Sequence, residues 1–175
     1  MRARLLLLAL PAALALGSCA PTVQEPDADP VVVYLVRHAE REEDGTSDPP
    51  LSEAGHDRAR LLAEMLKDAG ITRVHSTDLK RTRQTGAPLV EAREKSVEVY
   101  DPADLAGLAA RLSVAPGRHL VLGHSNTTGE LVSALGGDPG PPIDEAEYDR
   151  LYVVVIPAVG PSSTTLLRFG APYVP

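Results

Sequence analysis

Apolar positions along the chain fall in short blocks separated by longer periodic segments. Residues 31–36, Val-Val-Val-Tyr-Leu-Val, are continuously apolar, which predicts a strand buried on both faces. Five more strands are predicted from blocks of four to six residues, at 71–76, 97–100, 119–123, 151–156 and 164–169, the last two as a possible hairpin.

Periodic apolar positions between these blocks predict four helices. Ser52 is a candidate N-cap for a helix that runs to about Ala69 and ends at Gly70. The others are predicted at 78–93, from an Asp101-Pro102 start to Leu112, and from Gly123 to about Leu135. Strands alternating with helices predict an α/β fold, a three-layer α/β/α sandwich with a mostly parallel central sheet.

The first residues have a different character. Arg2 and Arg4 precede an apolar stretch over residues 5–16 that only Pro11 interrupts, and small residues follow it. This pattern predicts a secretory signal peptide over residues 1–18. The stretch is too short for a membrane span, which needs about 20 apolar residues.

Cys19 is the only cysteine and stands where cleavage is expected. The segment therefore resembles a bacterial lipoprotein signal, in which this cysteine becomes the lipidated first residue. The resemblance implies an exported lipoprotein anchored to a membrane through Cys19, in the periplasm or at the cell surface. An ordinary signal peptide with an incidental cysteine is the alternative. Residues 19–30 contain three prolines and predict a tether, which leaves 31–175 as one folded domain.

Composition narrows the function classes. The 175 residues are 43% hydrophobic and 23% charged, which is typical of a globular protein. A formal net charge of -7, aromatics at 3% and no Trp argue against a nucleic-acid partner. A negative total still permits a local cluster of Arg that binds an anion.

Basic side chains follow the ends of the predicted strands. Arg37 and His38 come directly after the first strand, and His124 follows the strand at 119–123. Arg81 lies near the start of a helix that follows a third strand. Ligands of open α/β sheets bind at the carboxyl ends of the strands. Arg and His at such an edge, without a Cys/His metal pattern, predict an oxyanion site for phosphate that needs no metal or cofactor.

Four segments in order carry a family resemblance: Val36-Arg37-His38-Ala39-Glu40, Pro50-Leu51-Ser52-Glu53-Ala54-Gly55, the run from Ser76 to Thr85, and Gly123-His124-Ser125. They resemble the motifs of the histidine phosphatase superfamily, branch 1, whose fold is phosphoglycerate mutase-like. One departure is Ala39, where the commonest motif has Gly. A methyl group restricts the backbone of that turn slightly but removes no charge and no nucleophile.

The resemblance implies a role for each matching residue. His38 would be the nucleophile that attacks phosphorus, and water would later hydrolyse the phosphohistidine. The non-bridging oxygens would be held by Arg37, Arg81 and His124. Arg41 and Ser125 are further candidates for substrate binding, with a solvated loop and a helix cap as their respective alternatives. His56, His75 and His119 have no such support.

The acid that protonates the leaving oxygen is less well defined. The family places a carboxylate beyond the second Arg, where Glu98, Asp101 and Asp104 lie here. Asp101 is the first choice because it stands at a predicted strand-to-helix junction, although a purely N-capping role fits equally. Glu40, beside the nucleophile, is the rival donor.

The resulting hypothesis is a metal-independent phosphatase that hydrolyses phosphomonoesters through a phosphohistidine at His38. A phosphomutase and a non-catalytic module that binds phosphorylated ligands at the cell envelope are the alternatives. We expect a small phosphorylated substrate, and the sequence leaves its identity and the oligomeric state open. The Pro-rich, acidic segment 138–149 is hypothesised to border the site.

Overall fold

The computed structural model describes residues 29–93 and 96–175. The predicted signal peptide (1–18) and Cys19 lie outside the described residues, so export and lipidation stay predictions. Within the described ranges, no helix is both long and apolar enough to cross a membrane.

Six strands form a single sheet in the order β3-β2-β4-β1-β5-β6. Their bounds are β1 (Val31–Arg37), β2 (Arg73–Ser76), β3 (Val97–Val99), β4 (Arg118–Gly123), β5 (Arg150–Ile156) and β6 (Ser163–Arg168). The first four in this order are parallel to one another, whereas β5 pairs antiparallel with β1 and β6 antiparallel with β5. The predicted mostly parallel sheet, with an antiparallel hairpin at one edge, is confirmed.

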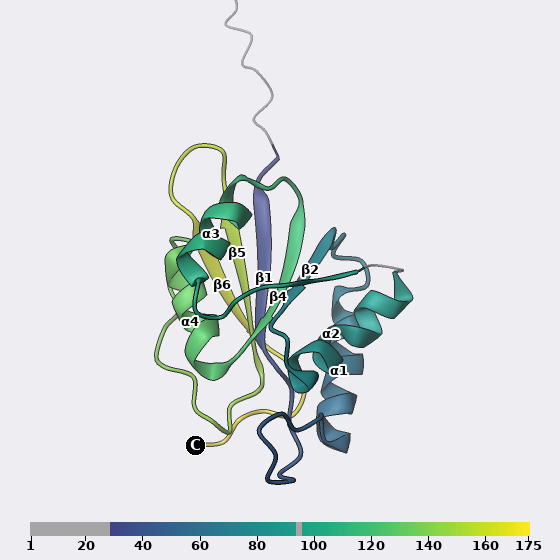
Figure 1. The fold of residues 1–175 in the computed structure, drawn as a ribbon. Helices are drawn as coiled ribbons and strands as arrows, with labels where there is room; N and C mark the ends of the chain where they lie inside the picture. Colours follow the sequence, from purple (N-terminus) through teal and green to yellow (C-terminus); the bar gives the residue numbers. More distant parts are fainter. Residues whose placement is uncertain (1–28, 94–95) are drawn as a thin grey trace, which may run out of the picture.

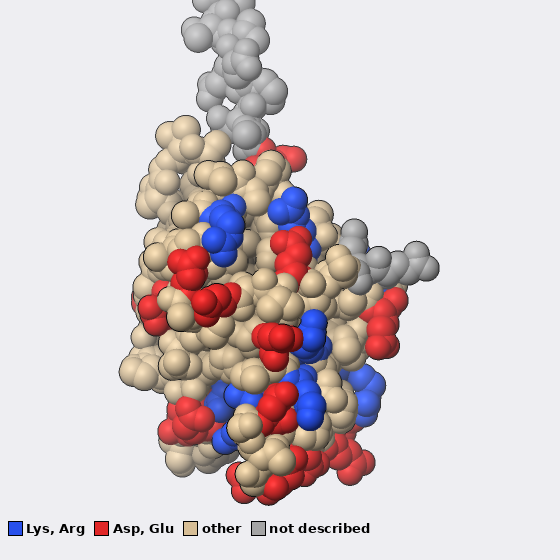
Figure 2. Space-filling model, in the orientation of Figure 1, with Lys and Arg blue, Asp and Glu red and all other residues tan. Residues whose placement is uncertain are grey.

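Four helices cover the two faces of the sheet: α1 (Glu53–Leu66), α2 (Lys80–Ala92), α3 (Leu105–Val114) and α4 (Ser125–Ala134). Helices α1 and α2 lie together on one side, and α3 and α4 lie on the other (Figure 1). The predicted three-layer sandwich is therefore confirmed. On the face drawn in Figure 2, basic and acidic side chains are interspersed and form no continuous basic patch.

Strand β1 explains why its sequence is apolar without alternation. Val33 and Leu35 point into the core beneath α3 and α4, whereas Val36 packs in the second core beneath α1 and α2. Successive side chains of a strand point to opposite faces, and both faces of this strand are covered by helices.

The predicted start of the third helix was wrong by three residues. Asp104, and not Asp101, is the N-cap of α3, because its carboxylate accepts the amide of Gly107 at 3.0 Å. The Asp101 carboxylate instead accepts the amide of Ala103 at 2.9 Å in the preceding turn. Both aspartates have short carboxylates that readily accept hydrogen bonds from nearby backbone amides. The sequence alone therefore did not show which of the two is the N-cap.

The sheet order brings the two predicted site histidines together. Strands β1 and β4 are neighbours, with Arg37 paired to Gly123 in the register. His38 and His124 are the next residues of the two strands, and the amide of His38 donates to the carbonyl of Gly123 at 2.9 Å. The carboxyl ends of two central strands thus form one edge at which a ligand can bind.

Gly55 in α1 supports the turn after His38. A Cβ at this position would collide with the carbonyl oxygen of Glu40, which is rigid backbone. We expect Gly55→Ala to lower the free energy of unfolding by about 1–3 kcal/mol, as overpacking does, measured by urea denaturation. Gly129→Ala in α4 is the matched control, because its Cβ would meet only an ordinary contact with Pro139. Equal stability of the two variants would contradict this account of the turn.

Candidate active site

A polar cavity of about 200 Å³ lies at the carboxyl ends of β1 and β4. Its lining consists of Arg37, His38, Arg41, Arg81, His124, Ser125, Asn126 and Glu145. Six of the seven residues predicted for the site are therefore brought together. Asp101 is the exception, since it does not line this cavity.

His38 has both ring nitrogens engaged in ways that select one tautomer. Its Nδ1 lies 2.8 Å from the carbonyl oxygen of Ala39, which can only accept, so Nδ1 carries the hydrogen. Its Nε2 accepts a hydrogen bond from Nε of Arg81 at 3.2 Å. The neutral ring therefore presents an unprotonated Nε2 to the cavity, as a nucleophile requires.

The surroundings of His38 keep it neutral. Its ring is buried, with 4% of the residue exposed. Burial lowers the pKa of His38 to about 3, and the nearby charges of Arg37 and Arg81 act in the same direction, against the raising effect of the Ala39 carbonyl. The imidazole is therefore uncharged at neutral pH without needing a carboxylate beside it.

His124 faces His38 across the cavity, with ring centroids 5.5 Å apart and an edge-to-face arrangement. The hydroxyl of Thr77 donates to Thr82 at 3.0 Å and lies 3.0 Å from Nε2 of His124. With its hydrogen directed at Thr82, this hydroxyl is an acceptor for an Nε2–H of His124. Burial, followed by the charges of Arg81 and Arg37, lowers the pKa of His124 to about 4.

Arg81 is placed by the first turn of α2. The hydroxyl of Thr85 donates to the Arg81 carbonyl at 2.8 Å and accepts the amide of Ala39 at 2.9 Å, which ties this turn to the nucleophile loop. One terminal nitrogen of Arg81, Nη1, is buried without a hydrogen-bond partner, and the Asp48 carboxylate is 4.0 Å away. A buried guanidinium nitrogen without a partner is suited to an incoming oxyanion.

Arg37 is engaged mainly with the protein itself. Its Nη1 donates to the carbonyl oxygens of Asp144, Glu145 and Glu147 at 2.8, 2.7 and 3.2 Å. Its guanidinium carbon lies 4.1 Å from the centre of the Tyr148 ring. Only Nε is buried without a partner and could reach a ligand. Arg37 thus holds the loop before β5 against the cavity, a role that the sequence did not predict.

None of the four carboxylates considered as the acid lines the cavity. Asp101 and Asp104 bind backbone amides around the start of α3. Glu98 lies beside His75 and Arg73 on the β2–β3 edge. The Glu40 carboxylate accepts three hydrogen bonds from Arg58, which draw it toward α1. Proximity to His38 in sequence did not place Glu40 in the site, because Arg58 captures it.

Glu145 is the one carboxylate in the lining, and its position was not predicted. It accepts hydrogen bonds from the hydroxyl of Ser125 and, at 3.1 Å, from Nη2 of Arg37, while 78% of its side chain stays exposed. The only signal in the sequence was the acidic segment 138–149, which was hypothesised to border the site. That hypothesis holds for Glu145.

Metal ligands are not grouped in the part of the chain that the structure describes. No cluster of three or more His, Cys, Asp or Glu residues there could hold a metal ion. The lining combines two buried guanidinium nitrogens without partners, which suit the oxygens of a phosphoryl group, with the unprotonated Nε2 of His38.

Comparison with known proteins agrees with this chemistry. The family described as the histidine phosphatase superfamily (branch 1) matches residues 33–105, a segment that contains the first three of the four motif segments. Over 66 residues the chain is 44% identical to the probable phosphoglycerate mutase GpmB of Yersinia pestis. That match covers 34% of this chain and 31% of the relative, so the similarity spans about a third of the relative's length.

Solved structures match over a larger share of the chain. The protein histidine phosphatase SixA, in complex with tungstate, superposes with a TM-score of 0.64 at 25% identity and covers 78% of this chain and 96% of its own. A mycobacterial glucosyl-3-phosphoglycerate phosphatase with inorganic phosphate gives a TM-score of 0.57 at 18% identity, covering 81% and 97%. The second shows the fold alone. The family match and the shared fold together support the histidine phosphatase superfamily for this chain.

Proposed function

We propose that this protein hydrolyses phosphomonoesters through a phosphohistidine formed on Nε2 of His38, without a metal ion. The observation that carries the proposal is the state of His38, a buried neutral imidazole whose unprotonated Nε2 lies 3.2 Å from an Arg81 nitrogen. A neutral nucleophile among fixed cationic donors is what attack on a phosphoryl group requires.

In the first step, the phosphoryl oxygens accept hydrogen bonds from Nη1 of Arg81 and Nε of Arg37, the two buried nitrogens without partners. For His124 to donate to a third oxygen, its Nε2–H would turn from the Thr77 hydroxyl to the ligand. The Nε–H of Arg81 turns from Nε2 of His38 to a phosphoryl oxygen, which frees the lone pair of Nε2. Nε2 then forms a bond to phosphorus as the bond to the leaving oxygen breaks, and the positive charge on the ring is offset by the transferred phosphoryl group. Positioning and charge account for most of the catalysis in such a reaction.

We assign proton transfer to Glu145, because it is the carboxylate that lines the cavity. Once protonated, and so released from its ion pair with Nη2 of Arg37, Glu145 would supply the hydrogen that the leaving oxygen needs. The resulting carboxylate would then take a proton from the water that attacks phosphorus and frees His38. Asp101 is not retained in this role, because its carboxylate binds the Ala103 amide outside the cavity.

A phosphomutase is the second candidate, favoured by the 44% identity to the probable phosphoglycerate mutase over 66 residues. A mutase would return the phosphoryl group from His38 to another hydroxyl of the substrate instead of to water. Release of inorganic phosphate in proportion to alcohol distinguishes hydrolysis from that transfer.

Replacing the nucleophile tests the proposal directly. We expect His38→Ala to reduce kcat/KM for 4-nitrophenyl phosphate by on the order of 10³-fold or more, with the parent activity unchanged by a strong chelator. His56→Ala is the matched control, since this histidine lies on α1 and lines no part of the cavity. Equal activity of His38→Ala and the parent would overturn the proposal.

The protonation state of His38 gives a second prediction. Because its pKa is lowered to about 3, His38 stays neutral as the pH falls from 8 to 5 and gains its proton only in strong acid. We expect NMR titration of the labelled imidazole to show an Nδ1–H tautomer with no change across that range. A titration centred near 6.5, the ordinary value, would contradict the burial and tautomer described for this ring.

Glu145 is tested by varying the leaving group. We expect Glu145→Gln to slow hydrolysis of an alkyl phosphate by about 10²-fold or more, because an alkoxide is a poor leaving group without a proton. Hydrolysis of 4-nitrophenyl phosphate, whose phenolate leaves unaided, should change far less. An equal loss on both substrates would assign Glu145 a structural role only.

A further inference from the structure

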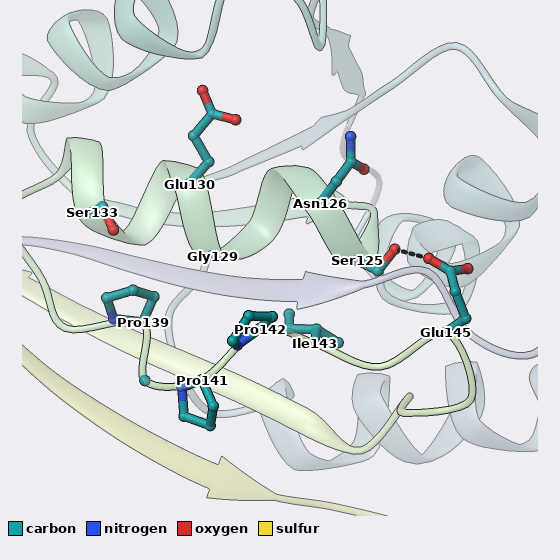
Figure 3. Close-up of a pocket in the computed structure, with 11 residues that line it drawn as sticks. Ser125, Asn126, Gly129, Glu130, Ser133, Pro139, Pro141, Pro142, Ile143 and Glu145 are labelled. Atoms are coloured by element: carbon teal, nitrogen blue, oxygen red, sulfur yellow. Dashed lines mark hydrogen bonds between the residues drawn. The ribbon is translucent and has the colours of Figure 1, made fainter.

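A groove opens from the polar cavity along helix α4. Its volume is about 430 Å³, and it lies between α4 and the segment from Pro139 to Glu145 (Figure 3). Ser125, Asn126 and Glu145 line both the groove and the polar cavity, so the two spaces adjoin, with the hydrogen bond from Ser125 to Glu145 at their boundary (Figure 3). Any substrate whose phosphoryl group reaches His38 has this groove as an adjoining space.

One wall of the groove is largely apolar, whereas the α4 wall carries mostly small and polar residues. Three prolines and Ile143 form one wall, as Figure 3 shows, and the α4 wall is low because it contains Gly129. A Cβ at Gly129 would lie 3.5 Å from the Cβ of Pro139, so a larger side chain there would enter the space. The absence of a side chain longer than a methyl group at position 129 is therefore what keeps the groove open.

The charged residues that line the groove are all acidic. Glu130 and Glu145 are the charged residues of the groove, and neither Lys nor Arg lines it. A phosphate or carboxylate in the groove would therefore find no cationic partner and would lie near the Glu145 carboxylate, whereas the Glu130 side chain points away from the proline wall (Figure 3). Such like-charge proximity without compensation weakens binding.

The proline wall is fixed from behind. The hydroxyl of Tyr152 donates to the Pro139 carbonyl at 2.8 Å, and Nη1 of Arg150 donates to the Pro141 carbonyl at 2.7 Å. Both side chains are buried in β5. The groove thus exists before any ligand arrives, which reduces the entropy lost on binding.

We infer that this groove binds the leaving group of the substrate, and that this group is elongated, largely apolar and free of further negative charge. The inference rests on the proposed phosphatase function. From Ser125 to Ser133 the α4 wall extends about 12 Å at the rise of an α-helix, which is long enough for two linked aromatic rings. A second phosphate on the substrate is disfavoured, which separates this site from one built for a bisphosphate.

Aryl phosphates of different length and charge test the inference. We expect kcat/KM for biphenyl-4-yl phosphate to exceed that for phenyl phosphate by about tenfold, because the second ring removes further apolar surface from water. A carboxylate at the far end of the biphenyl should abolish the gain, whereas an aminomethyl group there should preserve it. Equal values for all four compounds would overturn the inference.

Variants of Gly129 test whether the preference for biphenyl-4-yl phosphate arises in the groove. Gly129→Leu should bring biphenyl-4-yl phosphate down to the phenyl phosphate level and leave phenyl phosphate unchanged, which also shows that the variant is folded. Gly129→Ala, whose Cβ makes only an ordinary contact, should behave as the parent. A biphenyl preference that survives Gly129→Leu would place the second ring elsewhere and contradict the proposal.

Hydrolysis of phenyl phosphate separates a failure of the proposed function from a failure of the groove assignment. If the parent does not hydrolyse phenyl phosphate in a His38-dependent manner, the proposed function fails. If it does so but shows no preference among the four compounds, only the groove assignment fails.

Discussion

The site depends on the hydrogen bonds that the Arg37 guanidinium makes with the loop before β5. Arg37 is buried at the end of β1, with 3% of its side chain exposed, and it binds carbonyl oxygens of a loop more than 100 residues away in sequence. A buried cation is costly unless its hydrogens are paired. The loop carbonyls, the Glu145 carboxylate and the Tyr148 ring supply that compensation. The same contacts place Glu145 at the cavity and fix one end of the groove wall.

The remaining electrostatics follow from this arrangement. Arg37 and Arg81 surround His38 and His124 with positive charge, and burial removes the water that would stabilise an imidazolium. Both rings are therefore held neutral, while one nitrogen of each guanidinium stays without a partner. These two donors are in place for negative charge before substrate arrives. No reorganisation of either is then needed when charge develops in the phosphoryl transition state. Burial also lowers the pKa of Arg37 and Arg81. The loss of water therefore disfavours the charged form of the two guanidinium groups as well as that of the two imidazoles.

The sequence predicted the parts of the site that depend on strand ends. Arg37, His38 and His124 follow apolar strands whose pairing places them at one edge, and the sheet confirmed this. Glu145 could not be predicted in the same way, because its position depends on tertiary contacts with Arg37 and Ser125 and not on a local pattern. Asp101 was misplaced because its short carboxylate satisfies a nearby amide in a turn, and that competition depends on backbone geometry.

In the proposed reaction, the phosphoryl group passes through one defined atom, Nε2 of His38. The most direct measurement is rapid quenching of the reaction with a labelled phosphomonoester in alkali, where phosphohistidine survives, followed by NMR assignment of the phosphorylated nitrogen. The account predicts phosphate bonded to Nε2 of His38, because Nδ1 donates its hydrogen to the Ala39 carbonyl. Phosphate on Nδ1, on another residue or on no residue of the protein would contradict it.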